Sequence, residues 1–351
     1  MNTLGHIVKL TSFGESHGPL VGAVLDGLPS GIELDYEEIQ KELDRRKPGN
    51  SELSSERKED DKFEIVSGVF EKKTTGAPVT ILIKNNNTKS EDYLNIKNLY
   101  RPGHADYTYQ QKYGLRDYRG GGRSSARVTA AWVAAGAICK QFLKQKTKIE
   151  IQAIVSQVYD CKLEKPFSQY DWSNACNNAI HCPDDDTAQK MEKIINEVKS
   201  EGDTVGGVIS CRVLNCPVGL GEPLFGKLNA ELSKALMSIN AVKGIQFGNG
   251  FEVAALKGSE NNDSIKSNTN HDGGITGGIS NGKAIELDLV FKPTSSIKIE
   301  QDMLNMEGDI ETIKIMGRHD PCVLPRAIPI VEAMVYLVIA DFYLLNLKYL
   351  S

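Results

Sequence analysis

The segment Gly120–Arg127, which reads GGGRSSAR, concentrates residue types that bind anions. Its glycines let the backbone approach a ligand closely, and the apolar, alanine-rich stretch that follows predicts a buried helix to about Leu143. Arg123 and Arg127 are four residues apart, so we expect both to project from one face of the first helical turn, where backbone amides are unpaired. Cations at a helix N-terminus oppose the helix dipole, so the pattern indicates a bound anion, most often a phosphate. The alternative is a glycine-rich connection with two surface arginines.

Three of the six histidines lie in short turn-like segments. They are His17 in Ser-His-Gly, His104 in Pro-Gly-His-Ala-Asp and His319 in Gly-Arg-His-Asp-Pro-Cys. The reference pKa of imidazole, about 6.5, suits histidine to proton transfer near neutral pH. A histidine in a loop is more often an ordinary surface residue, and Asp320 before Pro321 is by itself a common turn initiator. Spacing alone does not show that these groups converge.

Basic residues recur outside the glycine-rich segment, at Arg101 and Arg318 and in two short runs. Arg45–Lys47 ends a predicted helix, where the negative end of the helix dipole explains it equally well. Lys292–Ser296 (KPTSS) follows a predicted strand and offers hydroxyls and amides to an oxyanion, although most such runs are only turns.

Two nucleotide-binding patterns are excluded. Gly221–Lys227 matches GxxxxGK, but Leu228 replaces the hydroxyl residue that binds magnesium, and Pro223 removes an amide from the phosphate cradle. No GxGxxG follows a predicted strand, so a Rossmann domain is unsupported.

The overall composition excludes further classes of protein. The 351 residues include 41 Lys and Arg against 46 Asp and Glu, a formal net charge of −5, and 40% are hydrophobic. This balance is ordinary for a globular protein and excludes a disordered or fibrous chain. Nonspecific nucleic-acid binding needs a basic surface, so we expect no nucleic-acid partner. Any basic site must be a local cluster of positive charge.

Cysteine usage and the chain ends bear on location. The seven cysteines form no CxxC pair and no metal-like spacing, and the first residues lack the layout of a signal peptide, so we expect reduced thiols, no metal and a cytoplasmic protein. The stretch 327–345 is nearly all apolar, but Glu332 and Asp341 interrupt it. We therefore expect a buried helix rather than a membrane span.

Predicted strands and helices alternate along the chain. The strands are expected at 21–25, 66–70, 78–83, 205–213 and 285–291, and the helices at 35–46, 126–143, 187–200 and 228–237. No repeat and no Pro/Ser-rich linker separates them, which favours one domain although the length allows two.

In sequence order, these segments resemble the chorismate synthase family. The resemblance rests on GESHG at 14–18, RPGHAD at 101–106, YGLRDYRGGGRSSAR at 113–127, MSINAVKG at 237–244, KPTSS at 292–296 and GRHDPC at 317–322. It implies an α+β fold, a β-α-β sandwich with helices packed between antiparallel sheets, formed by residues 1–351 as one catalytic domain. Family members usually assemble as homotetramers.

The resemblance also implies a reaction and a cofactor. Family enzymes are carbon–oxygen lyases that remove phosphate and a ring proton from 5-enolpyruvylshikimate 3-phosphate by anti-1,4-elimination. The product is chorismate, at the last common step of the shikimate pathway to aromatic amino acids. Family enzymes need reduced FMN (FMNH2), although the reaction involves no net redox change. Some relatives reduce their own flavin with NADPH; here we expect NADPH to act only indirectly, through an external flavin reductase.

The resemblance also implies roles for individual residues of this sequence. The substrate-binding positions are Arg46, Arg101 and Arg127. The implied catalytic residues are His104 as the acid for the leaving phosphate, His17 near the flavin, and Asp320 with Ser16 as the pair that relays the ring proton. The FMN-binding positions are Arg123, Ser124, Ser125, Asn240, Ala241, Gly277, Lys292, Pro293, Thr294, Ser295, Ser296 and Arg318.

One position departs from the family pattern. Glu52 stands where many relatives carry an arginine, and a carboxylate there would repel an anionic ligand. Arg57 and Lys47 are the candidates to replace that contact. The alternative function is a flavin- or phosphate-binding protein without catalysis, and the intact His17, His104 and Asp320 argue against it.

Overall fold

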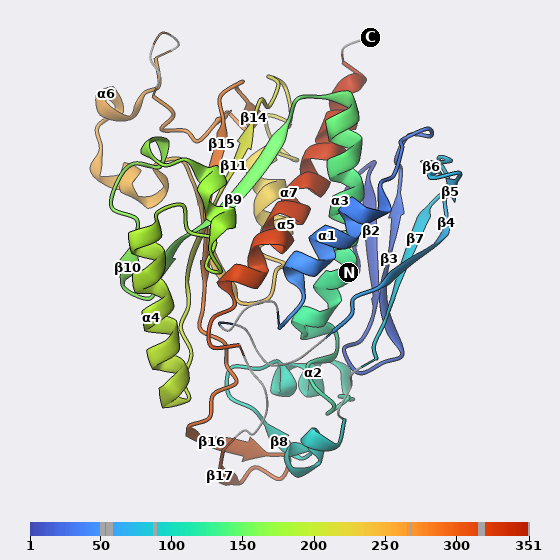
Figure 1. Cartoon of the computed structure of the whole chain (residues 1–351), viewed down its shortest axis with the longest axis vertical. Helices are drawn as coiled ribbons and strands as arrows, with labels where there is room; N and C mark the ends of the chain where they lie inside the picture. The colour runs from blue at the N-terminus through green and yellow to red at the C-terminus, as the bar shows by residue number, and fades with distance from the viewer. Residues whose placement is uncertain are drawn as a thin grey trace.

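Two five-stranded antiparallel sheets enclose a layer of helices (Figure 1). This arrangement comes from a computed structural model, which describes residues 1–49, 53, 59–86, 90–264, 266, 269–314 and 320–349. The α+β sandwich expected from the sequence is therefore confirmed. Glu52, Arg57, Arg318 and His319 lie outside the described residues.

The N-terminal sheet has the strand order β1-β2-β3-β7-β4. Its strands are β1 (Thr3–Leu4), β2 (Lys9–Gly14), β3 (Leu20–Asp26), β4 (Phe63–Ser67) and β7 (Val79–Lys84). In β7, Val79, Ile81 and Ile83 are buried, whereas Lys84 is exposed. Because buried and less buried side chains alternate along the strand, one face of the sheet packs against the helices.

The strand expected at 66–70 is interrupted. Gly68 has a φ of +78°, a left-handed conformation that glycine adopts without strain, and it separates β4 from β5 (Val69–Phe70). β5 then forms a short antiparallel hairpin with β6 (Lys73–Thr74).

The second sheet has the order β10-β9-β11-β15-β12. Its strands are β9 (Glu150–Val158), β10 (Cys161–Lys162), β11 (Gly207–Leu214), β12 (Val242–Phe247) and β15 (Ile285–Phe291). In β15, Ile285, Leu287 and Leu289 are buried, and Val290 points outwards with 46% exposure. This sheet therefore also packs one face on the helical layer.

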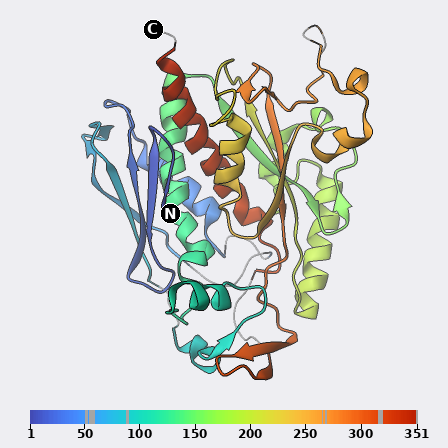
Figure 2. The same cartoon turned by 180° about the vertical axis from the view of Figure 1, so that it is seen from behind.

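The helical layer holds most of the core. It consists of α1 (Tyr36–Arg46), α3 (Thr129–Lys146), α5 (Leu228–Leu236) and α7 (Leu324–Leu347). Gly136 of α3 lies so close to α7 that an added Cβ would be 2.4 Å from the Ala333 Cβ, so only glycine allows this approach. Figure 2 shows α5 beside α7 from behind.

The apolar C-terminal helix lies where the sequence predicts it. α7 is long and apolar enough to cross a membrane, but 78% of its most apolar window is buried inside the protein. Asp341, one of its two acidic residues, accepts hydrogen bonds from the amides of His6, Ile7 and Val8. The helix is thus a core helix that also anchors the N-terminal segment.

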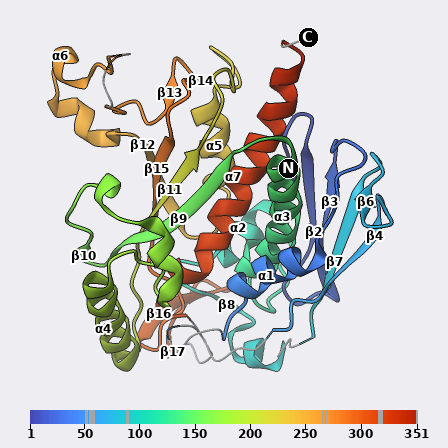
Figure 3. The same ribbon diagram turned by 45° about the horizontal axis from the view of Figure 1, so that its top comes forward.

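Shorter elements complete the fold. α4 (Asp185–Glu201) packs on the outside near β10 (Figure 3) and begins two residues before the expected Thr187. Asp184 caps its first turn, and Gly202 ends it in a left-handed conformation. A small sheet of β8, β16 and β17 and the helix α2 lie at one end of the molecule (Figure 1). The remaining bounds are α2 (Asp106–Tyr113), α6 (Gly258–Asn261), β8 (Leu99–Tyr100), β13 (Ile275–Thr276), β14 (Ile279–Ser280), β16 (Glu300–Asn305) and β17 (Ile310–Lys314).

Candidate active site

A cavity of about 400 Å³ opens where the ends of α1, α3 and α7 meet the loops around α2 and β15. Its volume falls within the roughly 300–1,000 Å³ typical of small-molecule sites. Of the residues predicted from the sequence, it is lined by Arg46, Arg101, His104, Ser124, Ser125, Arg127, Asn240, Ala241, Lys292, Thr294, Ser295, Ser296 and Asp320. Segments far apart in the sequence therefore converge on one hollow.

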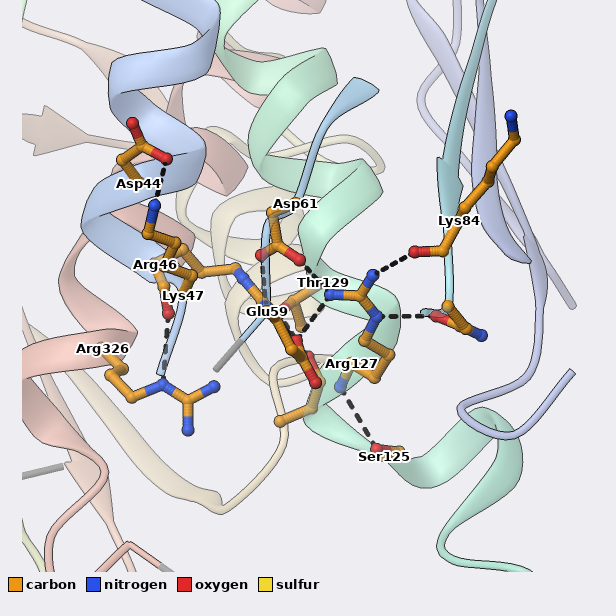
Figure 4. A network of polar contacts seen from close by, with 12 residues as sticks. Asp44, Arg46, Lys47, Glu59, Asp61, Lys84, Ser125, Arg127, Thr129 and Arg326 are labelled. Atoms are coloured by element: carbon orange, nitrogen blue, oxygen red, sulfur yellow. Dashed lines mark hydrogen bonds and ion pairs between the residues drawn. The ribbon is translucent and has the colours of Figure 1, made fainter. Parts of the chain in front are cut away.

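Two of the predicted arginines are held by buried carboxylates (Figure 4). Asp61 lies between Arg46 and Arg127, with its Oδ2 2.9 Å from the Arg46 Nη2 and its Oδ1 accepting from the Arg127 Nη1. Glu59 reaches the same pair, 2.6 Å from Arg127 and 3.3 Å from Arg46. The side chains of Arg46 and Asp61 are 1% and 0% exposed, so the charges face one another with little water between them.

The pKa shifts in this cluster follow from burial and charge. Burial alone would raise the pKa of Asp61, but the charges of Arg46 and Arg127 outweigh it and hold that pKa below its ordinary value. Burial lowers the pKa of Arg46, with Asp61 opposing this effect and the neighbouring Arg326 adding to it. The cluster is therefore a set of fixed charges that carries its own counterions.

Arg101 is fixed in a second ion pair. Its Nε and Nη2 lie 2.7 and 2.9 Å from the two carboxylate oxygens of Asp106, and its Nη2 also donates to the Gly120 carbonyl. Arg116 approaches the same carboxylate at 3.2 Å. Burial would raise the pKa of Asp106, but hydrogen bonds and charge from Arg101 lower it. The bidentate geometry fixes the plane of the Arg101 guanidinium at the cavity wall.

His104 is held at both ring nitrogens. Its Nδ1 lies 3.0 Å from the Pro102 carbonyl oxygen and its Nε2 lies 2.8 Å from the Ser296 Oγ. Gly103 has a φ of +69°, and an added Cβ there would come within 2.6 Å of the Ser295 Oγ. Glycine at this position thus lets the 292–296 segment close onto the histidine turn.

Lys292 also links the 292–296 segment to the histidine turn. Its Nζ donates to the Ser295 Oγ at 2.7 Å and to the Gly103 carbonyl at 3.0 Å. Burial lowers the pKa of Lys292, with a smaller contribution from the charge of Lys243. The lysine places a cation on the cavity wall between the histidine turn and β15.

His17 and Ser16 do not line the cavity but lie close to it. A Cβ at Gly120 would lie 2.7 Å from the His17 Cδ2, and the His17 ring packs edge-on against Tyr93, a lining residue, at 5.1 Å. Ser16 is 3% exposed, and its Oγ has no hydrogen-bond partner among the residues that the structure describes. Both residues lie next to Gly120, and His17 also contacts Tyr93, which lines the cavity.

Arg123 and Arg127 diverge, contrary to the expectation that both project from one helical turn. Residues 122–124 and 126–128 form separate 3-10 turns joined by an extended Ser125, and α3 begins only at Thr129. Arg123 points to β2, where it donates to the Gly14 carbonyl at 3.0 Å and to the Ser12 carbonyl and hydroxyl. Only Arg127 lines the cavity.

Three further predicted positions lie apart from the lining or outside the described chain. Pro293 sits beside lining residues without lining the cavity, and Gly277 occupies the turn between β13 and β14, with a φ of +65°. Arg318 lies outside the described residues. Among the residues with described positions, no group of three or more His, Cys, Asp or Glu side chains is placed to hold a metal.

Sequence reasoning missed Arg326. It lines the cavity from the first turn of α7, donates through Nε to the Arg46 carbonyl at 3.2 Å and forms an ion pair with Asp320. A cation at the start of an apolar helix is the signal that pointed to Gly120–Arg127, and it was present in Pro325-Arg326 too. Glu59 and Asp61 had no comparable local signal.

A two-sheet sandwich that gathers four arginines, a lysine and a histidine around one cavity defines a protein that binds a multiply charged anion. The family model for chorismate synthase matches residues 8–344. Chorismate synthases from Parabacteroides distasonis and Christiangramia forsetii are 54% and 52% identical to this chain, over 99% and 98% of it and 98% of each relative. A crystal structure of a chorismate synthase superposes with a TM-score of 0.77 at 30% identity, covering 98% of this chain and 93% of the other. The chain belongs to the chorismate synthase family, and it is a carbon–oxygen lyase of chorismate biosynthesis.

Proposed function

We propose that the cavity binds 5-enolpyruvylshikimate 3-phosphate beside reduced FMN and that its side chains carry out the elimination. The observation that supports this most is the convergence of Arg46, Arg101, Arg127 and His104 on one hollow of suitable size. The substrate carries a phosphate and two carboxylates, and planar guanidinium groups bind such oxyanions through paired hydrogen bonds.

The arginines are proposed to orient the substrate from positions that buried carboxylates fix in advance. Asp106 already fixes the Arg101 guanidinium, and Asp61 fixes those of Arg46 and Arg127. Donors that are fixed before the ligand arrives lose little conformational entropy on binding. Arg326 is proposed as a fourth cation of the set, because it lines the same wall and touches the Arg46 backbone.

His104 is proposed as the acid for the leaving phosphate. Phosphate departs more easily when a proton is supplied, and an imidazolium supplies one near neutral pH. The ring lines the cavity, and its contacts to Pro102 and Ser296 fix its orientation. Asp320, which also lines the cavity, is proposed with Ser16 to relay the ring proton, and His17 is proposed to act near the flavin.

The residues of the cavity fit a flavin. Asn240 lines the wall, donates to the Ser124 carbonyl at 2.6 Å, and keeps a buried Oδ1 with no partner among the described residues. A buried acceptor of this kind suits a ligand that carries N–H donors, as the flavin ring system does. Ser124, Ser125, Asn240, Ala241, Lys292, Thr294, Ser295 and Ser296 line the cavity and are proposed to hold the cofactor directly. Arg123 faces β2 and is proposed to support the site from outside the cavity. Gly277, Pro293 and Arg318 remain predictions from the family resemblance. When bound, reduced flavin supplies the electron density that assists departure of phosphate.

The cellular setting is proposed from the family pattern. Residues 1–351 are proposed to act as one catalytic domain, to assemble as a homotetramer and to work in the cytoplasm. The chain has no nucleotide-binding pattern, so its flavin is proposed to be reduced by an external reductase, with NADPH acting indirectly.

An anaerobic assay tests the proposal. The purified protein is mixed with dithionite-reduced FMN and 5-enolpyruvylshikimate 3-phosphate, and chorismate is followed by its absorbance together with released phosphate. We expect equal amounts of both products with reduced FMN and neither product with oxidised FMN. Product formation without any flavin would contradict the proposed cofactor, and the absence of product under all conditions would contradict the proposed site.

A further inference from the structure

His104 has a defined proton on one ring nitrogen. Its Nδ1 lies 3.0 Å from the Pro102 carbonyl oxygen, and a carbonyl oxygen can only accept a hydrogen bond. The Nδ1 therefore carries a hydrogen in both the neutral and the charged ring. It follows that Nε2 is the atom at which His104 gains or loses a proton.

The Nε2 faces a hydroxyl. The Ser296 Oγ lies 2.8 Å from it, and Ser296 lines the same cavity as His104. A ring nitrogen has a single in-plane bonding direction, so a proton on Nε2 that follows this contact points at the Ser296 oxygen. A hydroxyl both accepts and donates, and it can take this proton while giving up its own.

The Ser296 hydroxyl is positioned by its neighbours in the chain. The Ser295 Oγ donates to the Gly103 carbonyl at 2.9 Å, and the preceding Thr294 carbonyl accepts from the Thr204 hydroxyl at 2.7 Å. The Thr294 hydroxyl in turn donates to the Asp320 carbonyl at 2.8 Å. These contacts tie the 294–296 segment to three separate parts of the chain, so the distance to His104 is a property of the folded state.

We propose that Ser296 is a proton-relaying residue through which His104 delivers its proton to the leaving phosphate. The Nε2–H bond breaks as a new O–H bond forms at Ser296, and the original Ser296 proton passes to the phosphate oxygen. The C–O bond to phosphate breaks and its electron pair leaves with the phosphate, while the electron pair of the broken ring C–H bond enters the new conjugated diene and the ring proton passes to the proposed relay of Asp320 and Ser16. Ser296 ends unchanged, and His104 ends neutral and is reprotonated from water. This inference rests on the proposed role of His104 as the acid.

Single-turnover phosphate release at saturating reduced FMN and substrate tests the relay. In mixtures of H2O and D2O, the wild-type rate is expected to depend on deuterium fraction with the curvature of two protons in flight. Ser296→Ala is expected to lower the rate about tenfold or more, within the range of general acid catalysis. Ser296→Thr keeps the hydroxyl and is expected to retain the rate within about threefold.

A control separates the relay from loop positioning. Thr204→Val removes a hydroxyl that anchors the same segment but does not touch His104, and it is expected to keep the curved dependence and to lower the rate much less than Ser296→Ala does. The relay is overturned by a linear wild-type dependence, by a Ser296→Ala rate within about twofold of wild type, or by equal losses in Ser296→Ala, Ser296→Thr and Thr204→Val. If His104→Ala also keeps the wild-type rate, then His104 is not the acid, and the proposed function of His104 is contradicted together with the relay.

Discussion

Arg46 and Arg127 bind opposite oxygens of one carboxylate, that of Asp61. Arg46 ends α1 and Arg127 precedes α3, so the shared counterion also joins two elements of the helical layer. The same two guanidinium groups line the proposed substrate cavity. Their position for binding and part of the stability of the fold therefore depend on the same carboxylate.

Asp61→Asn is expected to destabilise the protein. Removing one partner of a buried ion pair leaves uncompensated charge, at a typical cost of about 3–5 kcal/mol. Urea unfolding at pH 7 measures the loss. Glu64→Gln is the matched control, because its ion pair with Lys84 at 3.0 Å is exposed and is expected to contribute less than about 1 kcal/mol. Equal effects of the two substitutions would contradict the assignment.

The stabilisation by Asp61 is also expected to depend on pH. The pKa of Asp61 in the folded protein is below its ordinary value, so its contribution is fully present above the unfolded pKa of about 4 and is lost as the pH falls through the lowered folded pKa. The difference in unfolding free energy between wild type and Asp61→Asn is therefore expected to shrink below pH 4. A difference that stays constant or grows there would show that charge is not the cause.

Glu59→Gln is expected to tighten substrate binding. Glu59 lines the cavity and places a negative charge 2.6 Å from Arg127, so it competes electrostatically with an anionic ligand. Loss of this charge should lower KM about threefold or more, with the largest effect at low salt. Asp44→Asn is the control. Asp44 pairs with Lys47 at the end of α1 and does not line the cavity. A raised KM in Glu59→Gln would show that the carboxylate helps the arginines instead.

His104→Ala is expected to lower turnover by roughly 100-fold or more, because it removes the proposed acid. Flavin affinity should change little, since the imidazole is assigned to the leaving phosphate. Turnover at saturating substrate and fluorescence titration with FMN measure the two quantities. Unchanged turnover would remove His104 from the mechanism.

Arg123→Ala is expected to weaken flavin binding indirectly and by no more than about tenfold, because Arg123 does not line the cavity and contacts β2 instead. Arg123 holds the end of β2 through Ser12 and Gly14, so its loss should also loosen the segment that carries His17. Arg119→Ala serves as the control, because Arg119 is 43% exposed and pairs with Asp117. An identical FMN titration for wild type and Arg123→Ala would contradict the assignment.

The sequence was most informative where chemistry and local structure coincide. The glycine-rich segment, the histidine turn and the KPTSS run each have a local signal, and residues from all three line the cavity. Alternating apolar residues likewise predicted strands such as β15, because period two follows directly from strand geometry.

Contacts between distant segments were not predictable from spacing. The carboxylates of Glu59 and Asp61 come from a polar stretch that reads as an ordinary loop, and only the fold brings them to Arg46 and Arg127. Arg123 turned away from the cavity because the chain forms 3-10 turns before α3, a detail that helical periodicity does not encode.

A crystal structure of the protein with FMN and 5-enolpyruvylshikimate 3-phosphate tests the central claim most directly. We expect the substrate in the cavity, with its oxyanions hydrogen-bonded to Arg46, Arg101 and Arg127 and its phosphate within reach of the His104–Ser296 pair. Density for the substrate outside this cavity, or in it with the phosphate facing away from His104, would contradict the account.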